Sequence, residues 1–119
     1  MSRSGTPEGA VLRAVCEYLL LQERMGRLWF HRTNNGGTFD ASRGLYRKPN
    51  GAGYKDGVPD VECAVAPSGR YVAFECKAER GRQSETQKAA QAAVERMGGV
   101  YVVARSVDDV VAALAALTR

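Results

Sequence analysis

Two carboxylates and one ammonium group are the side chains of this sequence whose types and spacing point to chemistry. Asp60 follows a Gly-x-Pro segment, and Glu75 and Lys77 come further along the chain, two residues apart. Converging carboxylates with open coordination positions suit Mg²⁺ or Mn²⁺, which keep several waters and accept phosphate oxygens as ligands. An ammonium group can hold a phosphate oxygen or position a water molecule. Together these residues indicate metal-assisted hydrolysis of a phosphodiester.

The segment that contains these residues reads as strand, turn and strand. Residues 61–66 and 71–77 are rich in strand-forming residues and are separated by a Pro-Ser-Gly-Arg turn sequence. Side chains two positions apart share a face of a strand, so Glu75 and Lys77 point to the same side. A short hairpin can bring Asp60 beside the end of the strand that carries Glu75. We therefore expect the two carboxylates on neighbouring strands.

Helical periodicity, caps and apolar runs predict the flanking elements. These are a helix over 7–24 capped by Thr6, a strand over 28–30, a helix from the Ser84-x-x-Gln87 capping box to about Met97, a strand over 100–104 and a helix over 107–117. The strand-helix-strand passage after the hairpin favours a parallel pairing. The fold class is α/β, with a small mixed central sheet flanked by helices.

A long basic segment, residues 32–57, interrupts this order. It is rich in glycine and has little periodic apolar content, which predicts an irregular loop. Basic and aromatic side chains are interleaved in it, a combination that contacts phosphates and stacks on exposed bases. A solvated flexible loop is the alternative interpretation. The candidate DNA contacts are Arg32, Asn34, Arg43, Arg47, Lys48 and Lys55.

Length and composition limit the number of domains, the kind of partner and the cellular location that we expect. With 119 residues and 45% hydrophobic content, the chain predicts one domain over 1–119, and its net charge of +4 favours a polyanionic partner. No apolar run approaches a membrane span or a signal-peptide core, so we expect a cytoplasmic protein without membrane partners. The three cysteines, Cys16, Cys63 and Cys76, are widely spaced among apolar residues, which predicts buried free thiols.

Together, these motifs resemble the VRR-NUC (virus-type replication-repair nuclease) family of the PD-(D/E)xK nuclease superfamily. The resemblance spans nearly the whole chain. It rests on Gly57-x-Pro59-Asp60, Gly69-Arg70, Glu75-x-Lys77, Ser84-x-x-Gln87, Gly98-Gly99, the closing Ser-x-Asp-Asp-Val segment and Glu8 in the first helix. It implies a restriction-endonuclease-like fold of the small stand-alone type that bacteriophages and prophages encode.

The resemblance also implies roles for individual residues. Asp60 and Glu75 would bind Mg²⁺ or Mn²⁺, the backbone carbonyl of Cys76 would complete the protein ligands, and Glu8 would be a further metal-site acid. Lys77 and Gln87 would join the two carboxylates as catalytic residues. Some alternatives stay open: Glu17 in place of Glu8 as the inward-facing acid, Gln87 as only the reciprocal cap of Ser84, and Lys77 as either base or phosphate contact. Glu62 can share the face of Asp60, although a solvent-facing position is more usual.

The resemblance implies a structure-selective DNA endonuclease that acts on branched DNA such as four-way (Holliday) junctions, in repair or recombination. We expect a homodimer, because one domain has one active site and paired cuts across a junction need two. A non-catalytic DNA-binding module of the same fold is the alternative. An RNA-directed nuclease is disfavoured, because the single histidine, His31, excludes a mechanism with paired histidines.

Overall fold

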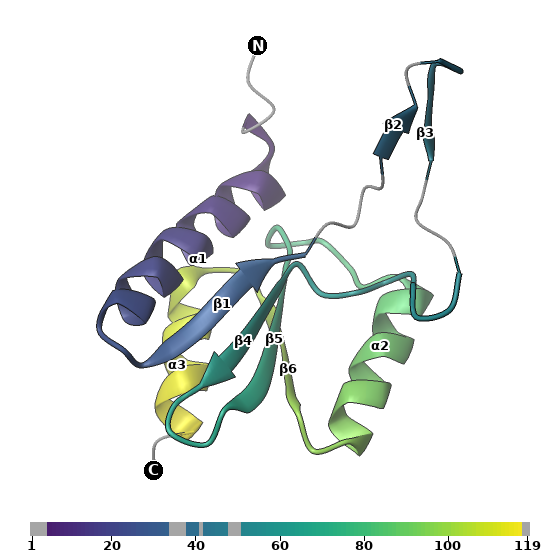
Figure 1. Ribbon diagram of the computed structural model, residues 1–119. Helices are drawn as coiled ribbons and strands as arrows, with labels where there is room; N and C mark the ends of the chain where they lie inside the picture. The colour runs from purple at the N-terminus through teal and green to yellow at the C-terminus, as the bar shows by residue number, and fades with distance from the viewer. Residues whose placement is uncertain (1–4, 34–37, 41, 48–50, 118–119) are drawn as a thin grey trace.

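Three helices and six strands make up the part of the chain that the computed structural model describes, residues 5–33, 38–40, 42–47 and 51–117. In chain order they are α1 (Pro7–Arg24), β1 (Leu28–Arg32), β2 (Thr38–Asp40), β3 (Leu45–Arg47), β4 (Val61–Val65), β5 (Arg70–Cys76), α2 (Glu85–Arg96), β6 (Val100–Ala104) and α3 (Val107–Leu117). Figure 1 shows their arrangement. Within these ranges no helix is long and apolar enough to cross a membrane.

Four strands form the central sheet, in the order β1-β4-β5-β6. Strands β1, β4 and β5 are antiparallel neighbours, whereas β6 runs parallel to β5. The parallel pair is joined through α2, as the crossover rule for such connections requires. The predicted hairpin, the parallel pairing and the mixed sheet are therefore confirmed.

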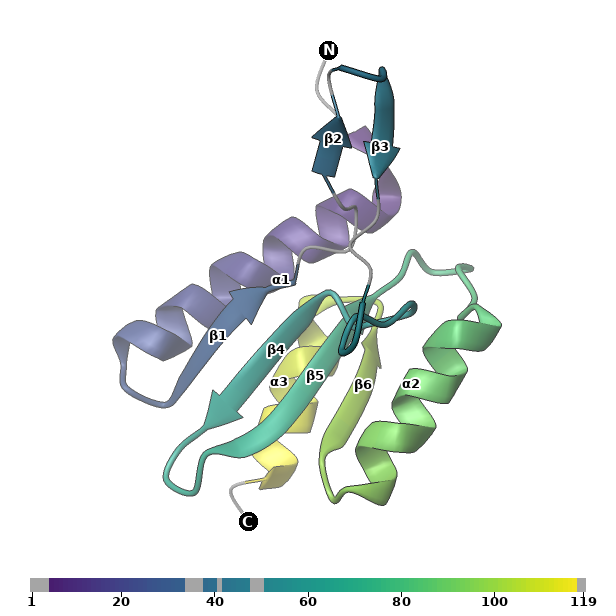
Figure 2. The ribbon, with the colours of Figure 1, turned by 45° about the vertical axis from the view of Figure 1, so that its right-hand side comes forward.

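Helices α1 and α3 cover one face of this sheet. Val15 and Leu19 of α1 and Val110 of α3 are fully buried in one cluster with Val72 and Phe74 of β5. The apolar residues of α1 recur at helical spacing, so burying this stripe against the sheet stabilises the fold through the hydrophobic effect. Figures 1 and 2 show α3 behind the sheet and α2 at its other side, next to β6.

The predicted helix starts and stops are confirmed at α1 and α2. Thr6 caps α1, since its side chain accepts a hydrogen bond from the Gly9 N–H at 3.0 Å. At α2 the Ser84 hydroxyl accepts from the Gln87 N–H at 3.1 Å, and the Gln87 side chain accepts from the Ser84 N–H at 2.8 Å. Gly98, with a φ of +91°, then turns the chain toward β6.

The prediction of an irregular loop over 32–57 is wrong in two places. Arg32 is the last residue of β1, and β2 and β3 form a separate antiparallel hairpin within the segment. Each of the two strands is three residues long, too short to show the alternation that identifies a strand in a sequence. Figure 2 shows this hairpin standing away from the central sheet.

The buried thiols give a first testable prediction. All three cysteines are free, and Cys63 and Cys76 are buried, as predicted, whereas Cys16 is half-buried. Burial raises the pKa of Cys63 to about 12 and that of Cys76 to about 12, and it also raises the pKa of Cys16. Thiolate is the reactive form, so at pH 8 we expect alkylation of Cys63 to be about a thousandfold slower in the folded than in the unfolded protein.

Mass spectrometry after iodoacetamide treatment, with and without urea, measures this difference at each cysteine. Cys16 serves as the internal control, because it is only half-buried and should react faster than the other two. Modification of Cys63 at the unfolded rate in native buffer would mean that its thiol is accessible and contradict the burial.

Candidate active site

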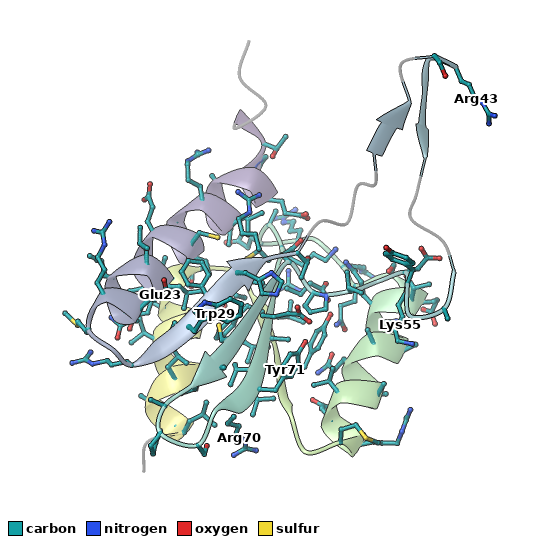
Figure 3. The ribbon with its side chains drawn as sticks, viewed as in Figure 1. Glu23, Trp29, Arg43, Lys55, Arg70 and Tyr71 are labelled. Atoms are coloured by element: carbon teal, nitrogen blue, oxygen red, sulfur yellow. The ribbon has the colours of Figure 1, made fainter. Side chains whose placement is uncertain are left out.

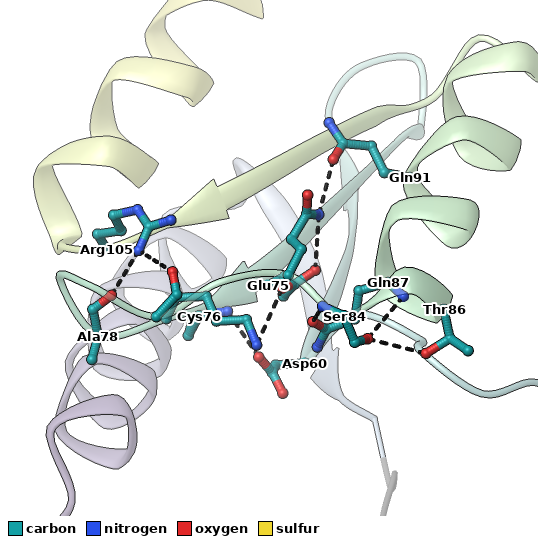
Figure 4. Close-up of polar contacts among 12 residues, drawn as sticks. Asp60, Glu75, Cys76, Ala78, Ser84, Thr86, Gln87, Gln91 and Arg105 are labelled. Carbon is teal, nitrogen blue, oxygen red and sulfur yellow. Dashed lines mark hydrogen bonds and ion pairs between the residues drawn. The ribbon is translucent and has the colours of Figure 1, made fainter.

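Asp60, Glu75 and Lys77 meet at the carboxyl end of β5. The β4–β5 register pairs Val61 with Phe74, so the next residues outward are Asp60 and Glu75. The Asp60 Oδ2 atom accepts a hydrogen bond from the backbone N–H of Cys76 at 2.8 Å, and Lys77 Nζ lies 3.6 Å from Glu75 Oε2. Figure 4 shows Asp60 next to the end of the strand that carries Glu75 and Cys76. The hairpin thus brings together the three residues that the sequence singled out.

Glu75 is buried completely, yet one of its two carboxylate oxygens lacks a hydrogen-bond donor. Its Oε1 atom accepts from the Tyr101 hydroxyl at 2.5 Å and from Gln83 Nε2 at 3.3 Å. Its Oε2 atom is buried without a hydrogen-bond partner among the described residues, and the Lys77 ammonium group lies 3.6 Å from it. A buried carboxylate oxygen without a donor costs free energy, unless a cation compensates for it.

The environment of Asp60 also favours a cation. Partial burial, the largest cause, and the negative charge of Glu75 raise the pKa of Asp60 above its usual value. The Cys76 N–H and the charges of Lys77 and Arg32 lower it, without cancelling the rise. A divalent cation between the two carboxylates would remove both costs, because it replaces lost hydration and offsets their repulsion.

A backbone oxygen lies on the same side as the two carboxylates. The N–H and C=O groups of one strand residue point the same way, and the N–H of Cys76 donates to Asp60. The carbonyl of Cys76 is therefore directed to the Asp60 side, whereas the N–H of Lys77 donates to Ala104 O at 3.0 Å on the β6 side.

These donors fit a cation that prefers oxygen ligands. No group of three or more His, Cys, Asp or Glu side chains that could hold a metal occurs in the part of the chain that the structure describes. Two carboxylates and a carbonyl are nevertheless sufficient for Mg²⁺ or Mn²⁺, which fill their other positions with water and substrate oxygens.

Three polar side chains that the sequence reading missed support Glu75. Besides Tyr101, Gln83 bridges Glu75 to Gln91 of α2, since its Nε2 also lies 2.9 Å from Gln91 Oε1. Figure 4 shows the contacts from Glu75 to Gln91. Gln91 Nε2 in turn donates to Glu95 Oε2 at 3.1 Å, so a chain of side chains links the buried carboxylate to the surface of α2. A polar partner for Tyr101 could have been predicted from the sequence, because a tyrosine inside an apolar strand usually directs its hydroxyl to a polar group.

Arg105 fixes the loop that follows Lys77. Its Nη1 atom donates to the carbonyls of Ala78 at 2.7 Å, Glu79 at 3.1 Å and Gly81 at 2.7 Å. Because Arg105 directly follows β6, the last strand of the sheet anchors the loop beside the site (Figure 4). Nothing in the sequence pattern around Arg105 indicated this role.

The hydroxyl of Tyr101 gives a second testable prediction. We expect Tyr101→Phe to lower the free energy of unfolding by about 2 kcal/mol, because a hydrogen bond to a buried charged group is lost. Tyr71→Phe is the matched control: its hydroxyl donates to Glu62, whose side chain is 33% exposed, so water can replace the bond at a cost of less than about 1 kcal/mol. Urea unfolding of both variants measures the difference, and equal losses would contradict the special environment of Glu75.

The other predicted acids lie outside this group. Glu8 is exposed, although its charge contributes to the raised pKa of Cys76. Glu17 is exposed as well, so the alternative that it is the inward-facing acid is wrong. Glu62 shares the face of Asp60, which is one of its two alternatives, and it is half-buried, accepting hydrogen bonds from Tyr71 at 2.7 Å and from His31 at 2.9 Å.

Gln87 has the capping role and lines a polar cavity. Its side-chain oxygen accepts a hydrogen bond from the Ser84 N–H. Among the described residues, the structure gives no contact between Gln87 and the two carboxylates. With Lys55, Gly57 and other residues it lines an open pocket of about 400 Å³ at the start of α2. Gly57 has a φ of +75°, and a Cβ atom at this position would lie 2.4 Å from the backbone carbon of Thr86. The segment before Asp60 therefore packs directly on α2.

The predicted DNA contacts are scattered around the site. Arg32 lies near enough to lower the pKa of Asp60, and Lys55 lines the polar cavity beside α2. Arg43 is at the turn of the β2–β3 hairpin, away from the central sheet (Figure 3). Arg47 ends β3, and nothing is described of its side chain; Asn34 and Lys48 lie outside the described residues. Of this set, Arg32 is the one whose charge acts on Asp60.

Comparison of the chain with protein-family models, with characterised proteins and with solved structures finds no match. The class of the protein therefore follows from its fold and from the geometry of its site. It is an α/β domain in which a buried carboxylate, a half-buried carboxylate and a lysine converge at the end of a hairpin strand.

Proposed function

We propose that this protein is an Mg²⁺- or Mn²⁺-dependent endodeoxyribonuclease with the PD-(D/E)xK restriction-endonuclease-like fold, of the VRR-NUC type. The observation that carries the proposal is the fully buried Glu75, whose donor-free Oε2 lies beside Lys77 and on the Asp60 side of the sheet. A buried polar atom without a hydrogen-bond partner calls for an explanation, such as a catalytic role or a bound ion or water.

The proposed roles follow from the contacts of each residue. Asp60, Glu75 and the Cys76 carbonyl would hold the metal, which when bound supplies charge neutralisation at the phosphoryl group and a water of lowered pKa. Lys77, next to them, holds a phosphate oxygen or positions the attacking water. Tyr101 occupies Glu75 Oε1 and so keeps Oε2 directed toward Lys77.

The proposed substrate is branched DNA such as a four-way junction. The net charge of +4 favours a polyanion, and Arg32 near the site supplies a guanidinium that can bind a phosphate. The protein would act as a homodimer, since paired cuts need two sites related by symmetry. By resemblance, it would work in the cytoplasm of a bacterial host of a phage or prophage that encodes it.

A non-catalytic DNA-binding module is the competing function. The same fold and basic residues would serve it equally well, but it has no use for a buried carboxylate beside a lysine. The convergence of Asp60, Glu75 and Lys77 therefore favours catalysis.

A cleavage panel tests the proposal. Labelled four-way junction, flap, single-stranded and linear duplex DNA are incubated with the protein in Mg²⁺, Mn²⁺ or EDTA. We expect metal-dependent cuts, strongest and symmetric on the junction. They should be lost in Lys77→Ala and kept in Lys88→Ala, whose exposed ammonium group pairs with Glu85 at 3.2 Å. DNA binding without cuts in any metal would instead support the binding module.

A further inference from the structure

The sheet face that carries Glu75 is only partly covered. Helix α2 lies over β6 at one side of this face, and none of the helices that the structure describes lies over β1 and β4 on it (Figure 2). On these strands Trp29 is 59% exposed, the His31 side chain is 46% exposed and Ala64 is exposed, while Tyr71 on β5 is half-buried. Figure 3 shows Trp29 and Tyr71 on the open part of this face, between α1 and α2.

The register connects this open area to the candidate active site. Three rows of side chains cross the same face: Trp29–Ala64–Tyr71, then His31–Glu62–Ala73, then the Asp60–Glu75 row of the site. Successive rows are two residues apart, about 7 Å along a strand, so the first and last rows are separated by roughly 14 Å. A strand of DNA covers this distance with roughly four nucleotides at the ~3.4 Å spacing of stacked bases, and with fewer when extended.

Hydrogen bonds hold two of the three aromatic rings of this area in place, and the third ring lies against one of them. The Trp29 and His31 rings are 5.3 Å apart and tilted by 39°. Glu62 accepts hydrogen bonds from His31 Nε2 at 2.9 Å and from the Tyr71 hydroxyl at 2.7 Å, so one carboxylate fixes two of the rings. Rings that are already ordered lose little conformational entropy when a flat ligand stacks on them.

The neighbouring sheet edge is closed to an additional strand. In β1 the backbone groups of Arg27 and Thr33 bond to the β4 side, so the N–H of Phe30 points outward. It donates to Glu23 Oε1 at 3.0 Å, which places an α1 carboxylate at the edge. Pairing with the β1 of a second copy would have to break this bond, which disfavours a second copy as the occupant.

We infer that Trp29, His31 and Tyr71 form a stacking surface for the bases of an unpaired DNA strand that leads into the active site. This inference rests on the proposed function and names the substrate feature that the nuclease would recognise: single-stranded nucleotides at a branch point. Aromatic rings stack on any base, so the surface selects for unpaired nucleotides and not for sequence. In a duplex the faces of the bases are already stacked on one another and cannot reach Trp29.

Trp29 makes the inference directly measurable, because the chain contains one tryptophan. The protein is titrated in EDTA, which prevents metal-dependent cleavage, with a 12-nucleotide single strand or with its blunt duplex. We expect the single strand to quench the tryptophan fluorescence strongly and the duplex to leave it nearly unchanged. Fluorescence anisotropy of the labelled single strand should show about tenfold weaker binding for Trp29→Ala. Trp29→Phe, which keeps a ring, should bind close to the unsubstituted protein.

Met97→Ala is the matched control, because Met97 is an apolar side chain at 83% exposure outside the three rows. It should leave single-strand binding unchanged. Single-strand binding without quenching, or equal quenching by the duplex, would overturn the inference. So would a tryptophan signal that changes with protein concentration alone, which would mean that a second copy covers this face. Binding in EDTA needs no catalysis, so a protein that binds but never cleaves would disprove the proposed function, while quenching by the single strand would still establish the stacking surface.

Discussion

Asp60→Asn is expected to slow metal-dependent DNA cleavage by at least about a thousandfold, on the order of 4 kcal/mol of transition-state stabilisation. The amide has the shape of the carboxylate and can still accept the hydrogen bond of the Cys76 N–H, but it lacks the negative charge that captures a cation. DNA binding in EDTA should be unchanged or slightly tighter, because one negative charge is removed.

The stability of this variant should change in the opposite direction. The pKa of Asp60 is raised, so the folded protein binds this proton more tightly than the unfolded chain, and ionised Asp60 lowers stability at neutral pH. The wild-type protein should therefore gain stability as the pH falls through the raised pKa of Asp60, and Asp60→Asn should not show this gain. Thermal unfolding of both proteins between pH 4 and 8 measures it. At pH 7 the variant should melt at the wild-type temperature or above it.

Asp108→Asn is the control for this prediction, because Asp108 is an exposed acid in the first turn of α3. It should cleave DNA at the wild-type rate. Addition of Mg²⁺ should raise the melting temperature of the wild-type protein and of Asp108→Asn, but not that of Asp60→Asn. Cleavage by Asp60→Asn at more than about a tenth of the wild-type rate would remove Asp60 from the mechanism.

Gly57→Ala is expected to have the second largest effect, a loss of about 3 kcal/mol or more in the free energy of unfolding together with loss of cleavage. Its φ of +75° is unfavourable for alanine, and the new Cβ would lie 2.4 Å from the carbonyl carbon of Thr86 and 2.7 Å from the nitrogen of Gln87. The clash can be relieved in two ways. Either the protein unfolds, or the segment before Asp60 moves away from α2 and displaces the Asp60 carboxylate from the site.

Gly26→Ala separates the two causes. Gly26 has the same φ of +75°, but no atom within 4 Å of a Cβ at its position, so this variant should lose only the roughly 1–2 kcal/mol of a left-handed backbone. Urea unfolding of both variants gives the comparison, and a DNA cleavage assay follows the site. Equal losses of stability, with full activity in both, would contradict the packing of the Gly57 segment on α2.

The sequence predicted those parts of the fold that local physics decides. Capping residues predict where two helices begin: Thr6 for α1 and the Ser84–Gln87 pair for α2. Gly98 predicts where α2 ends. The turn after Val65 fixes the β4–β5 hairpin, and the hairpin alone places Asp60 beside the end of β5. The convergence of the candidate site could therefore be derived from one short stretch of chain.

What the sequence could not predict depends on contacts between distant segments. Tyr101 reaches Glu75 because β6 returns parallel to β5 after α2, in a register that no local pattern encodes. Arg105 likewise donates hydrogen bonds to the loop after Lys77 only when β6 has paired with β5. The exposure of Trp29 depends on how far α2 extends over the sheet, and the apolar pattern of β1 is equally compatible with a covered face.

The dependence of the site on β6 has a consequence for the order of synthesis. Asp60, Glu75 and Lys77 leave the ribosome well before Tyr101, Ala104 and Arg105, which hold the buried carboxylate, the strand end and the loop in place. A nascent or prematurely terminated chain that ends before residue 100 would contain every acid and base of the site but none of these supports. Such a fragment would lack the contacts that hold Glu75 and the loop after Lys77 in place, so we expect the proposed cleavage of DNA to begin only after β6 has been made.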